Sequence, residues 1–324
     1  MLASKKISVM FLCVLAVTFL ASTAITRPAE PELRIAVNST TIESFPVFAA
    51  VDAMSANGAG SRIRLIPAAS GRIAMSQLVG GAADVATGSE TQALLNSVTD
   101  PRIRIILTLA ECRYRIIARR SAGIHRIEDL RGKSVAVTAN TSSHYYLDRM
   151  LRNARVNEQD ILLTALEGQD MPAALVKRTV DAVSIWEPHA QNSLEALGDD
   201  AVVLEDSSAY TERFNLNTRT DVLADPAKRA ALLALFREIA RSSARLRMRP
   251  PELISTLSPK IGLPAKTVMA VWPQFSFPAS LSGKLRAALG EVEPWVAAIQ
   301  KRQARAGNDL TVLIDNSVMD QALK

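Results

Sequence analysis

The apolar positions in the first third of the chain repeat with two periods, one typical of strands and one typical of helices. Short apolar runs alternate with polar positions as in half-buried strands, and apolar positions three or four residues apart follow most of them, as in amphipathic helices. The helices are expected to begin at Ser44, Ser70 and Ser89, because serine is a favoured N-terminal cap. The expected strands of this series are 33–37, 63–66, 84–87, 103–109 and 112–118.

A second series of the same kind begins after a polar stretch at residues 121–132. Its expected strands are 133–138, 161–165 and 180–186, and its expected helices are 143–154, 171–178 and 188–197. Gly198 is the expected stop of the last of these helices. From the helix-opening pair Asp225-Pro226 onward, the pattern is mainly helical to Lys324.

Strands that alternate with helices predict an α/β protein, and we expect mixed, mostly parallel sheets with helices on both faces. Two series separated by a short crossing further predict two lobes with a ligand cleft between them. The length of 324 residues is too great for one small core and fits one large or two moderate domains, and the two series favour the latter.

The first 24 residues have the pattern of a secretory signal peptide. Two lysines precede an apolar run at residues 7–20, and small residues follow at 22–24, so we expect cleavage after Ala24 and a periplasmic mature protein. The apolar run is shorter than a membrane-spanning helix needs, although an uncleaved signal anchor remains the alternative. The mature chain keeps one cysteine, Cys112, which lies in an apolar run and is expected in the core.

The charge of the chain limits its expected partners. The formal net charge of +6 falls to +4 when the two leader lysines are removed. The remaining surplus is spread along the chain without a basic block or interleaved aromatic residues, so nucleic acid is not an expected partner. A modest positive surplus does suit a protein that handles anions.

Patterns for catalysis and for metal or cofactor binding are weak. The run 132–134 resembles the end of a phosphate loop, but it leads into an expected strand instead of a helix. His125, His144 and His189 are far apart and form no metal-binding pair with helical spacing. We therefore expect a binding protein that is not an enzyme and has no catalytic residues, no metal and no cofactor.

Five stretches, in order along the chain, resemble a known family. They are Leu33–Val37, Leu78–Ser89, Asp129–Val137, Asn140–Leu147 and Val180–Pro188. The family comprises the substrate-binding proteins of ABC importers for nitrate, sulfonates and taurine, and for thiamine precursors, which have the type II periplasmic-binding fold. One related branch makes the thiamine pyrimidine and depends on a cysteine-rich motif that this chain does not contain.

The resemblance implies a protein that captures a small anionic solute, of the sulfonate, taurine or nitrate class, between two lobes. It implies delivery to an ABC permease in the inner membrane with its ATPase, by a monomer. It also implies that the chain re-enters its first lobe, so that residues 33–118 and 206–324 form one lobe and residues 119–205 the other. The alternatives are a ligand-binding sensor for a membrane receptor and a binder of a thiamine-precursor pyrimidine.

The best candidate anion site lies where an expected strand meets a helix, at Thr141, Ser142 and Ser143. Hydroxyls and free backbone N–H groups gather there, and the positive end of a helix favours an anion. A single cap needs only one of the three hydroxyls, yet capping alone remains the alternative for Thr141 or Ser142. His144 begins the same helix and is a weaker candidate for the cleft.

Other strand-to-helix corners are expected to face this one across the cleft. Ser89 and Glu90 follow a strand of the first series, although Ser89 also fits the start of a capping box. Trp186 and Glu187 follow a strand of the second series, where an indole offers an apolar wall and a carboxylate offers an acceptor; core packing is the alternative for Trp186. Thr40, Thr41 and Glu43 lie at the corner after the first strand, which the family commonly uses for binding, and Thr41 is the candidate there, ranked below Ser142.

Overall fold

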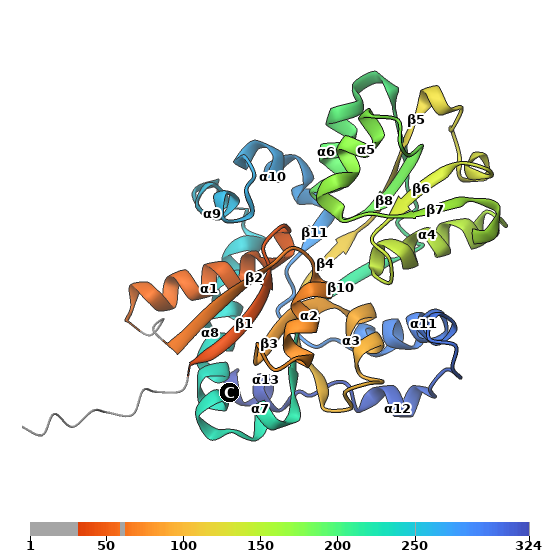
Figure 1. Ribbon diagram of the computed structural model, residues 1–324. Helices are drawn as coiled ribbons and strands as arrows, with labels where there is room; N and C mark the ends of the chain where they lie inside the picture. The colour runs from red at the N-terminus through yellow and green to blue at the C-terminus, as the bar shows by residue number, and fades with distance from the viewer. Residues whose placement is uncertain (1–31, 59–61, 250, 324) are drawn as a thin grey trace, which may run out of the picture. The chain divides into compact units, whose positions relative to one another are not determined.

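Two mixed sheets organise the computed structural model, which describes residues 32–58, 62–249 and 251–323 (Figure 1). These residues all belong to one compact unit, Pro31–Lys324. The expected signal peptide at residues 1–24 lies outside the described residues. Within the described ranges, no helix combines the length and the apolar character that a membrane span requires.

The first sheet has six strands in the order β11-β4-β10-β3-β1-β2. These strands are β1 (Leu33–Asn38), β2 (Ile63–Ala68), β3 (Val85–Ser89), β4 (Ile103–Arg113), β10 (Thr211–Arg219) and β11 (Phe275–Ser276). Strand β1 pairs in parallel with β2 and β3, whereas β10 pairs antiparallel with β3 and β4. The helices that follow the first three strands are α1 (Phe45–Ala56), α2 (Gly71–Val79) and α3 (Glu90–Asn96).

The second sheet has five strands in the order β7-β6-β8-β5-β9. These strands are β5 (Arg115–Arg119), β6 (Ser134–Val137), β7 (Leu162–Ala165), β8 (Ala182–Ile185) and β9 (Ala201–Leu204). Its helices are α4 (Ser142–Asn153), α5 (Met171–Val176) and α6 (His189–Leu197). In Figure 1, α5 and α6 lie on one face of this sheet and α4 on the other. The expected α/β class with two mixed sheets is confirmed.

The expectation of mostly parallel sheets is wrong. Strand β5 pairs antiparallel with β8 and β9, and β4 pairs antiparallel with β10 and β11. The physical reason is that the chain passes from one sheet to the other along extended strands, β4 into β5 and then β9 towards β10, without a helical crossover. A parallel pair needs a crossover connection, usually a helix. Strands β4, β5 and β10 reach their sheets without one, and each pairs antiparallel with its neighbours.

The division into lobes at residues 118 and 119 stays a prediction. Strand β5 forms its hydrogen bonds within the second sheet, so a division that follows the sheets would place the crossing at Tyr114.

The remaining chain is helical, as its pattern predicted. Its helices are α7 (Thr220–Ala224), α8 (Pro226–Arg247), α9 (Pro251–Leu257), α10 (Ala265–Val271), α11 (Gly283–Ile299), α12 (Gly307–Thr311) and α13 (Ser317–Ala322). Helix α8 packs against α1, and α11 packs against α3.

Local signals in the sequence set several helix ends. The Ser70 hydroxyl accepts a hydrogen bond from the Ile73 N–H at the start of α2, and the Asp225 carboxylate caps α8 in the same way. Gly198 ends α6 with a positive φ of 55°, a conformation that glycine adopts without steric cost. Cys112 is fully buried, as expected, and burial raises the pKa of its thiol well above the usual range.

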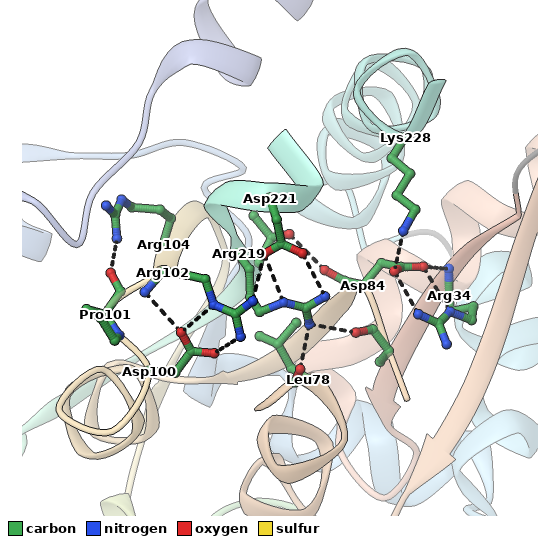
Figure 2. Close-up of polar contacts among 12 residues, drawn as sticks. Arg34, Leu78, Asp84, Asp100, Pro101, Arg102, Arg104, Arg219, Asp221 and Lys228 are labelled. Carbon is green, nitrogen blue, oxygen red and sulfur yellow. Dashed lines mark hydrogen bonds and ion pairs between the residues drawn. The ribbon is translucent and has the colours of Figure 1, made fainter. Parts of the chain in front are cut away.

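A network of ion pairs lies at the amino end of β3 (Figure 2). Arg34 and Lys228 both approach Asp84 at 2.9 Å. Burial disfavours the Asp84 carboxylate, but the hydrogen bonds from Arg34 and Lys228 outweigh it and lower its pKa to about 2. Arg219 pairs with Asp221 beside this group. These cations are therefore paired with carboxylates at the amino end of β3, away from Ser89 at the other end of the strand.

Candidate functional site

A small cavity lies where strands of both sheets end. Its lining includes Asn38 and Ser89, the last residues of β1 and β3, together with Trp186, which directly follows β8. The carboxyl ends of strands in open α/β sheets are where such proteins commonly bind ligands. The cavity volume is about 20 Å³, which accommodates about one water molecule. A larger ligand therefore requires the two sheets to separate.

Side chains from the two sheets hydrogen bond directly to one another beside the cavity. The Ser142 hydroxyl at the start of α4 donates to Glu212 Oε1 of β10 at 2.8 Å and lies 3.1 Å from the Thr91 hydroxyl of α3. The Gln92 amide of α3 donates to the Asn140 carbonyl at 2.7 Å. The direct contacts across the cavity are therefore polar.

Two further contacts join segments of the first sheet to segments of the second. The guanidinium of Arg72, which lines the cavity, forms an ion pair with Glu167. Thr41 donates its hydroxyl hydrogen bond either to Glu43 Oε2 at 3.0 Å or to the carbonyl of Glu187 at 3.3 Å. The Arg72 pair is partly exposed and contributes little stability in water.

Three carboxyl groups are buried close together at this site, those of Glu43, Glu90 and Glu212. Burial and the neighbouring Glu212 raise the pKa of Glu43 well above its usual range. Burial raises the pKa of Glu212 as well, against the hydrogen bond that it accepts from Ser142. Because like charges in a poorly solvated site repel strongly, one or more of these groups is protonated at neutral pH.

Glu90 is held by two donors. Its Oε1 accepts a hydrogen bond from the Tyr210 hydroxyl at 2.9 Å, and its Oε2 accepts one from the Arg213 backbone N–H at 2.9 Å. Burial and the nearby Glu212 nevertheless raise the pKa of Glu90 to about 8. The predicted position of Glu90 beside the cleft agrees with this geometry, although its role in ligand binding stays a prediction.

Trp186 forms part of the cavity lining and carries a buried indole N–H without a hydrogen-bond acceptor among the described residues. Its ring packs edge-on against His189, with ring centroids 5.9 Å apart. Burial lowers the pKa of His189 to about 4, so this imidazole is neutral at pH 7. Trp186 is therefore mostly buried, as core packing requires, and also borders the cavity, as a binding residue would.

The three hydroxyls predicted as an anion site have three different partners. Thr141 caps α4, with its side chain accepting from the Ser143 N–H. Ser143 donates to the Ser184 carbonyl of β8 at 2.7 Å and is fully buried away from the cavity lining. Only Ser142 reaches across to the other sheet, where its partner is a carboxyl group. Their roles in ligand binding stay predictions.

Two other predicted site residues are engaged in structural contacts. His144 lies 2.9 Å from Glu158 and packs edge-on against Trp295, outside the cavity lining. Glu187 accepts a hydrogen bond from the Arg115 guanidinium at 2.7 Å. Burial raises the pKa of Glu187, while the Arg115 charge opposes that shift. Neither geometry supports a direct ligand contact in this arrangement.

The corner at Ser89 differs in detail from its expectation. Ser89 occupies the N-cap position of α3, but its side chain makes no capping hydrogen bond and lies 2.6 Å from the Thr91 hydroxyl instead. The Gln92 side chain extends across to Asn140, so the expected capping box does not form. Ser89 does line the cavity, as predicted.

Sequence reasoning placed Glu43 at the corner after the first strand without selecting it as a site residue, and it missed Glu212. Glu43 lies in a short 3-10 turn after β1, Ile42–Ser44, and Glu212 lies on β10, which was not among the expected strands. One signal was present: Glu212 stands two residues before Phe214, in phase with a buried apolar position. A glutamate on the buried side of a strand is unusual and marks a functional candidate.

The described residues contain no group of three or more His, Cys, Asp or Glu side chains with the arrangement to hold a metal ion. The cavity lining offers hydroxyl groups, carboxyl groups, the amides of Asn38 and Gln92, the indole N–H of Trp186 and the guanidinium of Arg72.

A family model described as NMT1/THI5 like matches residues 57–235. An aliphatic sulfonates-binding protein of Escherichia coli (strain K12) is 32% identical over 155 residues, which span 47% of this chain and 47% of that protein. The chain thus matches about half the length of this relative.

Solved structures show the same fold at low identity. The alkanesulfonate-binding protein SsuA of Xanthomonas axonopodis pv. citri, bound to MOPS, has a TM-score of 0.72 and 19% identity, covering 89% of this chain and 99% of that one. The periplasmic nitrate-binding protein NrtA of Synechocystis PCC 6803 has a TM-score of 0.73 and 13% identity, covering 91% and 89%. These likenesses confirm the expected two-lobed periplasmic-binding fold.

Proposed function

Because this chain belongs to the NMT1/THI5-like family, whose model matches more than half of it, we propose that it is the solute-binding component of an ABC importer. The proposal places the mature protein in the periplasm, where it captures a small solute and delivers it to a permease and its ATPase. In this proposal the protein is a monomer and has no catalytic activity. The names of the sulfonate-binding and nitrate-binding relatives support this role.

One observation carries the proposal, namely that the cavity is lined from both sheets and bridged by direct side-chain hydrogen bonds. Ser142 of the second sheet's α4 donates a hydrogen bond to Glu212 of β10 in the first sheet. Gln92 of the first sheet's α3 donates one to the Asn140 carbonyl, which precedes α4. Contacts of this kind break when the sheets separate and can re-form through a bound solute. A clamp built in this way needs no reactive group to do its work.

The relatives' names favour the anionic solute that the sequence predicted, of the sulfonate, taurine or nitrate class. The guanidinium of Arg72 at the cavity is consistent with that class. The carboxyl groups of Glu43, Glu90 and Glu212 oppose it, because an anion placed against them is repelled unless they are protonated. No observation favours the alternative of a sensor for a membrane receptor.

The proposal is tested with the solute that the protein itself retains. Native mass spectrometry of the protein purified from its own periplasm identifies that solute, and unfolding followed by refolding removes it. Small-angle scattering then compares the stripped protein with and without the solute. We expect the radius of gyration to fall on addition, because a solute that contacts both sheets favours the closed population.

A solute of similar size and charge that gives no heat of binding serves as the control and should leave the radius of gyration unchanged. A radius of gyration that stays constant while calorimetry shows saturation by the retained solute would contradict the clamp.

A further inference from the structure

Glu43 and Glu212 each have one buried carboxyl oxygen without a hydrogen-bond partner among the described residues. The hydroxyls of Tyr114 and Ser89 also face Glu212 and, like that of Ser142, lower its pKa against the effect of burial. Glu43 Oε2 lies 3.0 Å from the Thr41 hydroxyl, and Glu212 Oε1 accepts from the Ser142 hydroxyl at 2.8 Å. Glu43 Oε1 and Glu212 Oε2 are buried and accept no hydrogen bond from any described donor. Both residues line the cavity.

The two carboxyl groups lie within hydrogen-bonding reach of each other. Two carboxylates in a poorly solvated site cannot both stay ionised at this separation unless a positive charge or a donor lies between them. In the solute-free cavity a shared proton meets this requirement. A ligand with N–H donors meets it equally well, since each free oxygen can accept a charge-assisted hydrogen bond.

A second, independent group at the cavity also lacks its partner. The Trp186 indole N–H comes from the other sheet, is only 5% exposed at the residue level and has no acceptor among the described residues. A buried N–H without an acceptor is costly, so the site is incomplete without a group that accepts from it. A bare metal ion cannot supply that acceptor, whereas an organic solute can.

We propose that the cleft takes a small organic nitrogen base, carrying an ammonium or amidinium group, whose N–H donors bind between Glu43 and Glu212. This assignment rests on the proposed function, because it names the class of solute that the clamp captures. An acceptor elsewhere on the same solute faces Trp186. The cavity of about 20 Å³ is too small for such a solute, so it enters when the Ser142–Glu212 contact opens.

Binding of the charged base has a consequence for protons. The proton shared by Glu43 and Glu212 is displaced to solvent when the cation takes its place, and no bond other than this O–H bond is broken. Proton release is measured by calorimetry in two buffers of different ionisation enthalpy. An anion bound at the same place would cause proton uptake or no exchange, so the sign of the exchange distinguishes the two classes.

Three related probes separate the charged groups of the solute. Taurine carries both an ammonium and a sulfonate group, ethanesulfonate lacks the ammonium group, and ethylammonium lacks the sulfonate group. We expect taurine to bind at least about tenfold more tightly than ethanesulfonate at pH 7, ethylammonium to bind measurably, and both amines to release protons.

The variants Glu43→Gln and Glu212→Gln should each remove most of the advantage of taurine over ethanesulfonate. Glu252→Gln, which removes an exposed carboxylate of α9, is the matched control and should leave the ratio unchanged. Thermal melting reports whether each variant is folded, and having two cleft variants keeps the test decisive if one of them fails to fold.

Ethanesulfonate binding as tightly as taurine, or more tightly, would overturn the assignment of a nitrogen base. Failure of both amines to bind would overturn it as well. The proposed function is judged separately, because its scattering test uses the retained solute whatever its charge. An anionic retained solute that closes the clamp therefore refutes this inference and leaves the proposed function standing.

Discussion

Single carboxyl groups decide the electrostatics of the cleft. Glu90 is fully buried between Tyr210 and the Arg213 backbone, yet two hydrogen bonds do not replace the hydration that it loses. The network of Arg34, Asp84 and Lys228 shows the opposite case, because two cations there lower the pKa of a buried carboxyl group. Burial alone therefore does not set the charge of such groups in this protein; the partners do.

The raised pKa of Glu90, about 8, predicts a pH dependence of stability. In the unfolded chain glutamate has its ordinary pKa of about 4.3, so between that pH and 8 the folded state binds more protons than the unfolded state. The contribution of Glu90 to stability is therefore fully present below pH 4 and is lost as the pH rises to 8. We expect the free energy of unfolding to fall by up to about 1.4 kcal/mol per pH unit from this group across that range.

Glu90→Gln cannot ionise, so its free energy of unfolding should fall less steeply between pH 5 and pH 8 than that of the wild type. Urea unfolding at several pH values measures both slopes, with Glu252→Gln as the control for loss of one exposed charge. Parallel slopes for the wild type and Glu90→Gln would show that Glu90 is ionised in the folded protein.

The start of α4 shows how one helix end serves several purposes. Successive residues of a helix point in directions about 100° apart, so Thr141, Ser142 and Ser143 face different surroundings. Thr141 closes the helix end, Ser143 ties the helix to β8, and Ser142 meets β10 of the other sheet. A run of hydroxyls at one helix start thus contains a cap, a packing contact and a contact across the cleft.

Adjacent serines of α4 are expected to respond oppositely to substitution. Ser143→Ala leaves the buried Ser184 carbonyl without its donor, so the free energy of unfolding should drop by about 1–3 kcal/mol with little change in affinity. Ser142→Ala removes the donor that positions Glu212, so affinity for the retained solute should fall about tenfold or more. Calorimetry and urea unfolding on both variants measure the two effects.

Unchanged affinity in Ser142→Ala, together with reduced stability, would assign Ser142 a structural role only. Ser55→Ala is a suitable control, because this exposed hydroxyl of α1 bonds only within its own helix.

The molecule as a whole is joined at the cleft by polar contacts and by an apolar cluster, in which His144 and Tyr145 of α4 pack against Trp295 of α11. Two extended connections link the sheets, and the Arg72–Glu167 pair adds an ionic contact at the rim of the cavity. Exposed ion pairs contribute about 0–1 kcal/mol, which is small for stability but comparable to the free-energy differences that set the population of two conformations.

Glu167→Gln should therefore enlarge the solute-free protein in solution. We expect its radius of gyration at low salt to exceed that of the wild type, and high salt to reduce the difference by screening the pair in the wild type. Small-angle scattering of both proteins, with Glu252→Gln as the matched control, makes the measurement. Equal radii of gyration at low salt would show that the pair does not bias closure.

Local features were predictable from the sequence because their causes lie within a few residues. Ser70 before α2, Asp225 before α8 and Gly198 after α6 act through neighbouring backbone groups, and the predicted helices follow from apolar spacing. The alternation of these elements, together with the five family stretches, was enough to identify the α/β class, the family and Ser89, Ser142 and Trp186 as residues beside the cleft.

Only the tertiary structure decided what surrounds those residues. The antiparallel course of β10 brings Glu212 to Ser142 and to Glu43, which are distant in the sequence, and no local pattern encodes such an approach. The separate partners of Thr141, Ser142 and Ser143 likewise depend on which sheet each hydroxyl meets. Apolar periodicity determines which face of an element is buried. Strand pairing between remote segments determines which polar groups share the buried interior, and these groups set the charge of the cleft.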